Sequence, residues 1–141
     1  MGPEVPYLSA IVALMYFTNC TRPDIAFAVN LLPRYHAAPT RRHWVGLKTI
    51  LRYLQGTQDL GLWYSRKGVS AMVGYVDAGY MSDPHNARSH AGFVFLYGGT
   101  SISWRSMKQT LVATSTNHSE IIALYEAARE CVWLRRMVGH I

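Results

Sequence analysis

Residues 92–105 read GFVFLYGGTSISWR: two runs of β-branched and aromatic residues on either side of Gly98-Gly99. Two glycines in this position predict a β-hairpin, because the preferred two-residue turn needs positive φ at both positions. Upstream, MVGYVD at residues 72–77 predicts another strand, and Leu60 to Tyr64 predicts a short one. The second half of the chain is therefore expected to contain a small antiparallel sheet of three or four strands.

A long helix is predicted after this sheet. Ser115 or Asn117 is a suitable N-cap, and the helical pattern continues to Arg136. Apolar residues recur at helical spacing and predict the buried face: Ile121, Leu124, Ala128 and Cys131.

The first 56 residues predict three helices. The first, Tyr7 to about Thr18, is apolar on all sides and is expected to be buried. The second begins near Pro23 and runs to about Tyr35, with Pro33 kinking or ending it.

The third helix, Arg41 to Leu54, is expected to be amphipathic, with Thr40 as its N-cap and Gly56 as its C-cap. Its apolar stripe is predicted to contain Trp44, Leu47, Leu51 and Leu54. The sequence thus predicts an α+β fold: a helical subdomain at residues 1–58, then an antiparallel sheet with one long helix at residues 59–141.

The composition of the 141 residues is that of a folded protein, since half are hydrophobic and 16% are charged. A net charge of +6 favours nucleic acid or another polyanion as partner, although a basic surface without a partner explains it too. Cys20 and Cys131 lie in apolar runs without further ligands nearby. We expect buried, reduced thiols, with neither a disulfide nor a zinc site.

The apolar run Leu8 to Phe17 has two possible interpretations. It is too short to span a membrane, but its length suits the core of a signal peptide. The preceding residues include Glu4 and no Lys or Arg, and no small-residue cleavage site follows. A buried helix is the preferred interpretation.

Basic side chains form the candidate nucleic-acid contacts. Arg41, Lys48 and Arg52 line one side of the third predicted helix, and Lys108, next to Gln109, follows the predicted hairpin. Such residues could hold phosphates, but a solvated basic face would have the same pattern.

Two acids are the candidate catalytic residues. Asp77 ends an apolar strand, where an unpartnered carboxylate is costly to desolvate. Glu120 lies in the first turn of the long helix, where it would also complement the helix dipole. His118 is two residues before Glu120, and a capping or surface role is expected for it. Together the two carboxylates could hold Mg²⁺, which prefers oxygen ligands.

Ordered segments along almost the whole chain resemble the Pol polyprotein of copia-type retrotransposons. They are TRPDIA (21–26), HW (43–44), LRYL (51–54) with Gly56-Thr57, GYVDA (74–78), SW (103–104), KQ (108–109), VA (112–113), Glu120 and ECVWL (130–134). The resemblance implies the end of a reverse transcriptase, a connection-like segment, followed by an RNase H domain.

In that family, Asp77 and Glu120 match the first two carboxylates of an RNase H that uses Mg²⁺ to cleave RNA–DNA hybrids. The third acid lies on a strand after the long helix, and no Asp or Glu follows Glu130 here. Gly79 also replaces a usual Asp. The resemblance therefore implies a truncated RNase H-like sheet with an uncovered edge, and a non-catalytic chain without a cofactor; active ribonuclease H is the alternative.

A second resemblance is to secreted oomycete effectors of the RxLR class, whose products act inside plant cells. It is carried by the degenerate RxLR sequence Arg52-Tyr53-Leu54-Gln55 and by the apolar N-terminus. This segment lies inside a predicted amphipathic helix, whereas a translocation signal should be exposed and flexible. A transposon fragment would be intracellular and bind nucleic acid, whereas an effector would be secreted, enter a host cell and bind a host protein.

Overall fold

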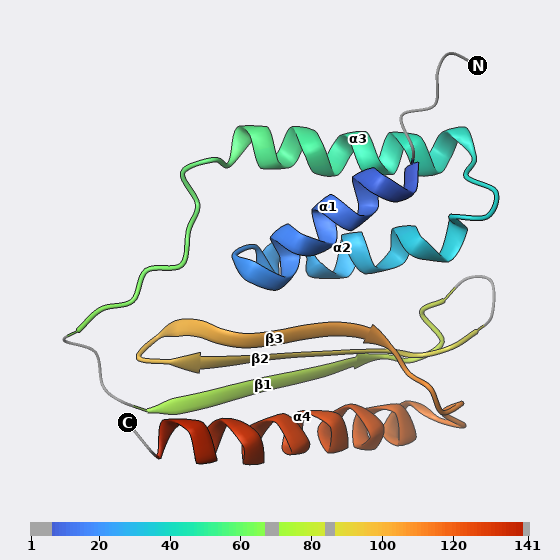
Figure 1. The fold of residues 1–141 in the computed structure, drawn as a ribbon. Helices are drawn as coiled ribbons and strands as arrows, with labels where there is room; N and C mark the ends of the chain where they lie inside the picture. The colour runs from blue at the N-terminus through green and yellow to red at the C-terminus, as the bar shows by residue number, and fades with distance from the viewer. Residues whose placement is uncertain (1–6, 67–70, 84–86, 140–141) are drawn as a thin grey trace. The chain divides into compact units, whose positions relative to one another are not determined.

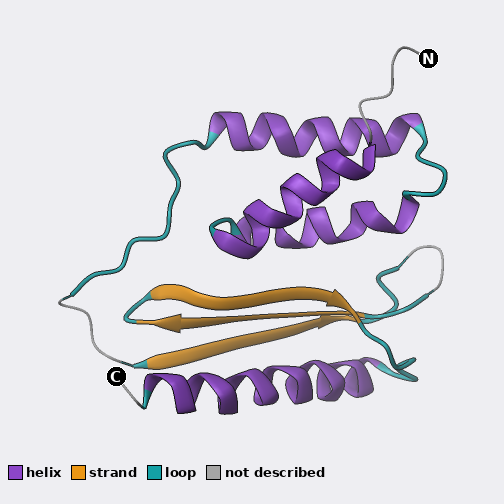
Figure 2. Cartoon of the chain, in the orientation of Figure 1, coloured by secondary structure: helices purple, strands orange, loops and turns teal. Residues whose placement is uncertain are grey.

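The computed structural model describes residues 7–66, 71–83 and 87–139 (Figure 1). The chain divides into two compact units, residues 1–63 and residues 64–141. Helices make up the first unit, and the second combines strands with one helix (Figure 2). The predicted α+β class is confirmed.

The first unit contains the three predicted helices. They are α1 (Tyr7–Cys20), α2 (Ala26–Leu31) and α3 (Arg41–Gly56), with 3₁₀ turns at Pro23–Ile25 and Leu32–Tyr35 on either side of α2. Pro23 and Pro33 lie in these 3₁₀ turns, where the α-helical hydrogen bonding is interrupted, as expected for a residue without an N–H. The core contains Tyr7, Ile11, Leu14, Ile25, Val29, Leu32, Leu47 and Ile50.

Helix α1 is not buried on all sides, which corrects the sequence-based expectation. Its buried face comprises Tyr7, Ile11, Leu14 and Thr18, one stripe at helical spacing. The opposite face is exposed, including Val12 at 58% and Tyr16 at 70%. A helix at the edge of a small bundle contacts its neighbours along one side only, even when apolar residues surround it.

The buried stripe of α3 also differs from the predicted one. Leu47 and Ile50 are buried, Trp44 and Leu54 pack against the same core, and Leu51 is 46% exposed. Since successive residues are about 100° apart on a helix, the stripe is rotated slightly away from Leu51.

The second unit contains an antiparallel sheet in the order β1-β2-β3. Its strands are β1 (Met72–Gly79), β2 (His90–Tyr97) and β3 (Thr100–Lys108), and helix α4 (Thr116–Val138) follows. Gly98 and Gly99 have φ values of 59° and 84°, so the predicted hairpin turn is confirmed. Leu60 to Tyr64 is not a strand but an irregular segment, so that prediction is wrong.

Helix α4 packs against one face of the sheet (Figure 1). Its buried residues are Ser119, Ala123, Ala127 and Leu134. The predicted stripe is wrong, because Ile121 and Leu124 are 57% and 60% exposed. Small side chains bring the first half of the helix close to Ala78 and Ala91 of the sheet, whereas Ile121 and Leu124 face outward.

The cysteines only partly match the expectation. Both thiols are free, but Cys20 is exposed and Cys131 is half-buried. Cys20 ends α1, beyond the buried stripe of that helix. In the ranges that the structure describes, no helix has the length and apolar character needed to cross a membrane.

Candidate functional site

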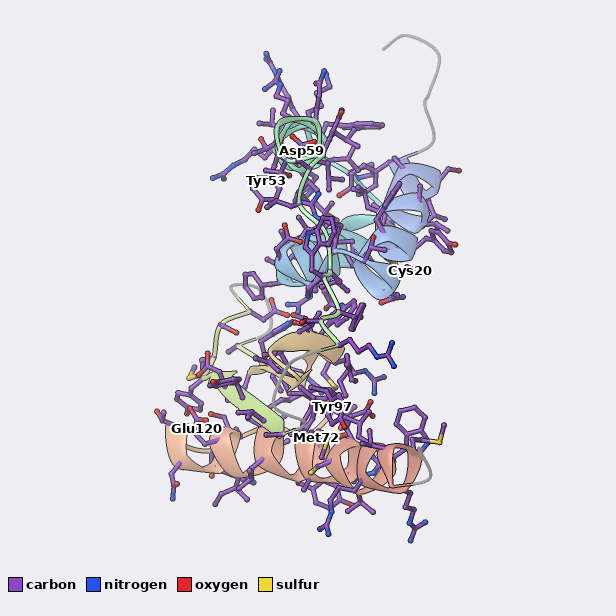
Figure 3. The ribbon with its side chains drawn as sticks, turned by 90° about the vertical axis from the view of Figure 1, so that its left-hand side faces the viewer. Cys20, Tyr53, Asp59, Met72, Tyr97 and Glu120 are labelled. Carbon is purple, nitrogen blue, oxygen red and sulfur yellow. The ribbon has the colours of Figure 1, made fainter. Side chains whose placement is uncertain are left out.

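The two candidate acids lie at the same end of the second unit. Ala78, which follows Asp77, packs with Ala91 and with Ala123 of α4. Glu120 is three residues before Ala123 and therefore lies on the neighbouring part of the same helix face. Figure 3 shows Glu120 near one end of α4, away from the paired residues Met72 and Tyr97 at the far end of β1 and β2.

The side chains of these acids do not meet across a common surface. Val76 and Ala78 pack beneath α4, and successive strand residues point to opposite faces, so Asp77 points away from the helix. Asp77 is exposed and Glu120 is half-buried. Neither carboxylate has a hydrogen bond or an ion pair with any residue that the structure describes.

The donor set does not fit the Mg²⁺ site that the resemblance implies. Within residues 7–66, 71–83 and 87–139, no three His, Cys, Asp or Glu side chains gather closely enough to hold a metal ion. A two-ion phosphodiesterase site needs several carboxylate oxygens converging on the same point. The two candidate acids instead point in different directions, one from the strand and one from the helix.

A buried polar cluster that the sequence did not reveal supports the start of α4. The Gln109 side chain donates a 2.8 Å hydrogen bond from Nε2 to the Ser119 carbonyl, and the Gln109 backbone N–H donates to the Ser89 carbonyl at 2.9 Å. Gln109 is 3% exposed and Ser119 is fully buried. Gln109 therefore anchors the helical turn that carries Glu120.

Lys108 has a structural partner in this region. Its Nζ lies 3.2 Å from Oδ2 of Asp83, a carboxylate side chain that is only 2% exposed. Desolvating such a carboxylate without a cation would be costly, so Lys108 compensates it. Asp83 carried no recognisable signal in the sequence, since it follows β1 in an irregular segment.

His118 takes part in the hydrogen bonds around the N-terminal cap of α4, in which Ser115 is the N-cap residue. Ser115 Oγ accepts a hydrogen bond from the His118 backbone N–H at 3.1 Å. The His118 ring nitrogen Nδ1 in turn lies 3.3 Å from the Thr114 backbone N–H donor. These contacts fix the first turn of α4 just before Glu120.

Several segments that carry the resemblance bind one another. Arg22 donates to both carboxylate oxygens of Asp24, at 3.0 and 2.7 Å, and also to the Thr57 carbonyl and hydroxyl at 3.1 and 2.7 Å. The hydrogen bond from Arg22 holds the pKa of Asp24 below its ordinary value. In the second unit, the Ser103 hydroxyl donates a 2.6 Å hydrogen bond to Glu130. These hydrogen bonds stabilise the fold, so a structural role accounts for the residues and no catalytic role is needed to explain them.

Basic residues on α3 form an exposed row. Arg41, Lys48 and Arg52 are all exposed, and their spacing of seven and four residues places them on one helix face. We call these three residues the basic row. Helix α3, RRHWVGLKTILRYLQG, has four basic side chains and no acidic one. Nothing within the helix therefore neutralises the row.

The degenerate RxLR segment lies in the last turns of the same helix. Arg52 and Gln55 are exposed and Leu54 packs against the core of the first unit. Tyr53 is 43% exposed, with the Arg22 guanidinium carbon 5.5 Å from its ring centroid. The segment is helical and partly packed.

Comparison with known proteins gives close relatives. The chain is 48% identical over 131 residues to secreted RxLR effector protein 161 of Plasmopara viticola, covering 93% of this chain and 92% of that protein. It is 42% identical to the Pol polyprotein from transposon TNT 1-94 of Nicotiana tabacum, over 98% of this chain but 10% of the polyprotein. The identity to the Pol polyprotein from transposon RE2 of Arabidopsis thaliana is 33%, over 94% of this chain and 9% of that protein.

No protein-family model matches the chain, and no solved structure matches it. Its relatives nevertheless define the class of protein: the chain is related to retrotransposon Pol polyproteins. It spans about a tenth of the length of the polyproteins that it matches. The chain is homologous to Pol polyproteins of copia-type transposons, and secreted RxLR effector protein 161 of Plasmopara viticola is a relative of similar length.

Proposed function

We propose that residues 1–141 are a copia-type Pol segment that binds nucleic acid without cleaving it. The basic row on α3 is the observation that carries this proposal. From Arg41 to Lys48 to Arg52 the row extends over about 16 Å of helix, at about 1.5 Å per residue. Phosphates of one strand recur about every 3.4 Å along a duplex axis, so the row can lie beside several of them.

The position of the charges supports a ligand rather than a purely structural role. Arg41 and Arg42 lie in the first turn of α3, where positive charge opposes the helix dipole and costs about 0.3–1 kcal/mol per residue. Acidic residues would stabilise this turn better, and α3 has none. A bound phosphate backbone would offset the unfavourable interaction.

The different directions of the Asp77 and Glu120 side chains support the non-catalytic part of the proposal. Two carboxylates that point from different faces would hold Mg²⁺ weakly and position the attacking water poorly. Binding of an RNA–DNA hybrid that weakens steeply with salt, without cleavage, would support both parts. Cleavage by the wild-type chain would refute the second part alone.

A secreted effector that binds a host protein is the second candidate, favoured by the 48% identity to secreted RxLR effector protein 161 over 92% of its length. This function requires the N-terminal helix to be exported, and Arg52 to Gln55 to be read as a signal. Both segments are parts of the folded first unit, and Ile11 and Leu14 of α1 lie in its core. Export would therefore require α1 to leave this core, whereas folding of the first unit requires α1 to stay in it.

A further inference from the structure

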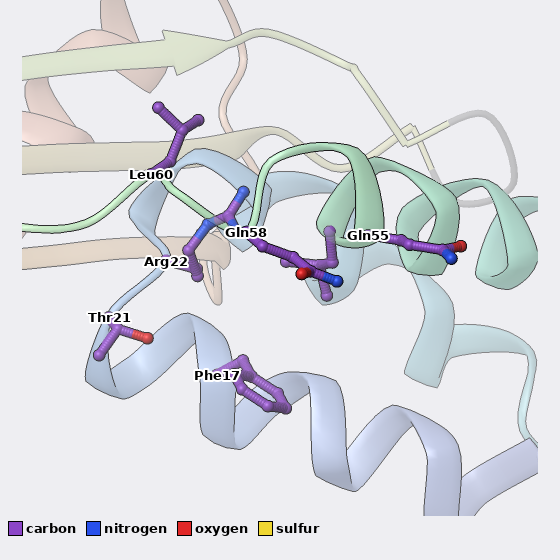
Figure 4. A pocket seen from close by; sticks show the side chains of 7 residues that line it. Phe17, Thr21, Arg22, Gln55, Gln58 and Leu60 are labelled. Carbon is purple, nitrogen blue, oxygen red and sulfur yellow. The ribbon is translucent and has the colours of Figure 1, made fainter.

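A pocket of about 360 Å³ opens in the first unit, between the end of α1 and the end of α3. Figure 4 shows Phe17 and Thr21 on one side of this pocket and Gln55 and Gln58 on the other, with Arg22 and Leu60 towards one end. The volume lies within the range of small-ligand pockets.

The lining combines an aromatic face with amide groups. Phe17 is 50% exposed, so part of its ring is open to a ligand. Gln55 and Gln58 are exposed, and each amide offers both hydrogen-bond donors and an acceptor. A planar heteroaromatic ring with polar edges matches these groups, because its face can stack on Phe17 while its edge binds the amides.

Arg22 gives the pocket a fixed polar wall, with its charge balanced by Asp24. Its side chain is held by Asp24 and by Thr57, with four N–H···O contacts of 2.7–3.1 Å. It is only 7% exposed, so its position varies little. A preorganised wall of this kind lowers the entropy cost of ordering a ligand.

One residue that lines the pocket, Gln55, is a neighbour of the basic row on α3. Gln55 follows Arg52 by three residues on α3 and therefore lies next to it on the helix surface. A strand whose phosphates lie along Arg41, Lys48 and Arg52 would reach the pocket at its end.

We propose that this pocket takes one unpaired nucleobase of the nucleic-acid strand held by the basic row. The inference rests on the proposed nucleic-acid binding and adds where, and in what state, a base is bound. An unpaired base is the occupant because a paired base must first leave its stack and break its base pair. The chain should therefore prefer a hybrid with an overhang to a blunt one.

The test measures binding of three RNA–DNA hybrids to the full 141-residue chain by fluorescence anisotropy. One hybrid is blunt, one carries a single unpaired nucleotide at one end, and one carries an abasic nucleotide there. Stacking on an aromatic side chain should make the overhang hybrid bind about tenfold more tightly than the other two.

The decisive variant is Phe17→Leu, which keeps an apolar side chain but removes the aromatic face. It should abolish the overhang preference and leave binding of the blunt hybrid unchanged. Phe27→Leu is the matched control, since Phe27 is 53% exposed, lies on α2 and does not line the pocket. Thermal unfolding of both variants checks that the fold is retained.

The outcomes separate this inference from the proposed function. A preference that survives Phe17→Leu, or that the abasic hybrid also shows, overturns the pocket assignment while salt-dependent binding of the blunt hybrid stands. Binding of the overhang hybrid alone supports the pocket and overturns the role of the basic row. Failure of all three hybrids to bind overturns both.

Discussion

The side-chain amide of Gln109, at the end of β3, donates a 2.8 Å hydrogen bond to the carbonyl of Ser119 in the first turn of α4. Both residues are almost fully buried, so water cannot replace this bond. Gln109→Leu should lower the free energy of unfolding by about 1–2 kcal/mol, because a buried carbonyl is then deprived of one of its donors.

Denaturant titration of Gln109→Leu measures this destabilisation, with Gln58→Leu as the matched control at an exposed position. The control should stay within about 0.5 kcal/mol of the wild type. Equal stability of the two variants would show that Gln109 does not anchor α4.

Gly74 of β1 lies directly beneath the Phe95 ring. A Cβ at this position would be 2.5 Å from Phe95 Cε1, and Phe95 is 4% exposed. Gly74→Ala should therefore destabilise the second unit by about 1–3 kcal/mol through overpacking. At Gly56, where no atom lies within 4 Å of an added Cβ, the same change should be neutral or stabilising. Thermal unfolding compares the two, and a neutral Gly74→Ala would contradict the packing argument.

The basic row should determine the salt dependence of binding. Replacing Arg41, Lys48 and Arg52 with Gln should reduce the slope of log K against log salt by about 2–3, since each phosphate that is no longer neutralised accounts for about 0.9. The control replaces Arg129, Arg135 and Arg136 of α4, which removes the same charge from another exposed helix. If both triple variants reduce the slope equally, binding follows net charge and the α3 row has no special role.

The chain should not cleave an RNA–DNA hybrid with either Mg²⁺ or Mn²⁺. A positioned metal ion supplies several kcal/mol of transition-state stabilisation, and the described acids do not converge to hold one. Product formation is followed on a labelled RNA strand, with Asp77→Asn and Glu120→Gln as controls for contaminating nuclease. Cleavage that disappears in both variants would establish an active ribonuclease H.

Export of the N-terminus would distinguish an effector from a transposon segment. Residues 1–25 fused to a secretion reporter should be retained, and deletion of residues 1–20 should unfold the first unit. The deletion removes Tyr7, Ile11 and Leu14 from the core, and each large side chain contributes about 1.5–3 kcal/mol. A secreted reporter together with a deletion variant that still folds would favour the effector and contradict the core assignment.

The sequence predicted the elements better than their buried faces. Local conformational preferences predicted the hairpin turn at Gly98-Gly99 and the helix cap at Ser115. The same reasoning predicted that Pro23 and Pro33 interrupt the helical hydrogen bonding. Helix α4 has apolar residues on two sides, and periodicity alone selected the side with Ile121 and Leu124. The buried side was determined by the small partners Ala78 and Ala91, which belong to other elements.

In the candidate site, too, the local pattern could be predicted and the contacts between distant residues could not. Charge pattern was enough to find Arg41, Lys48 and Arg52 on one exposed face, because a helix fixes their relative positions. Asp83, Gln109 and the Arg22 to Thr57 bonds depend on residues distant in sequence, which single-sequence periodicity does not relate. The direction of the Asp77 side chain required the sheet register and the position of α4 together.

The hydrogen bonds of Arg22 to Asp24 and to Thr57 form at different stages of synthesis. Asp24 is two residues away and can pair with Arg22 as soon as both leave the ribosome, whereas Thr57 is 35 residues away. A contact of that separation requires closure of a long loop, and here it also requires the end of α3. The first unit therefore cannot form both sets of Arg22 hydrogen bonds until Thr57 has emerged, and a nascent chain halted before that point lacks this link between the segment that follows α1 and the residue that follows α3.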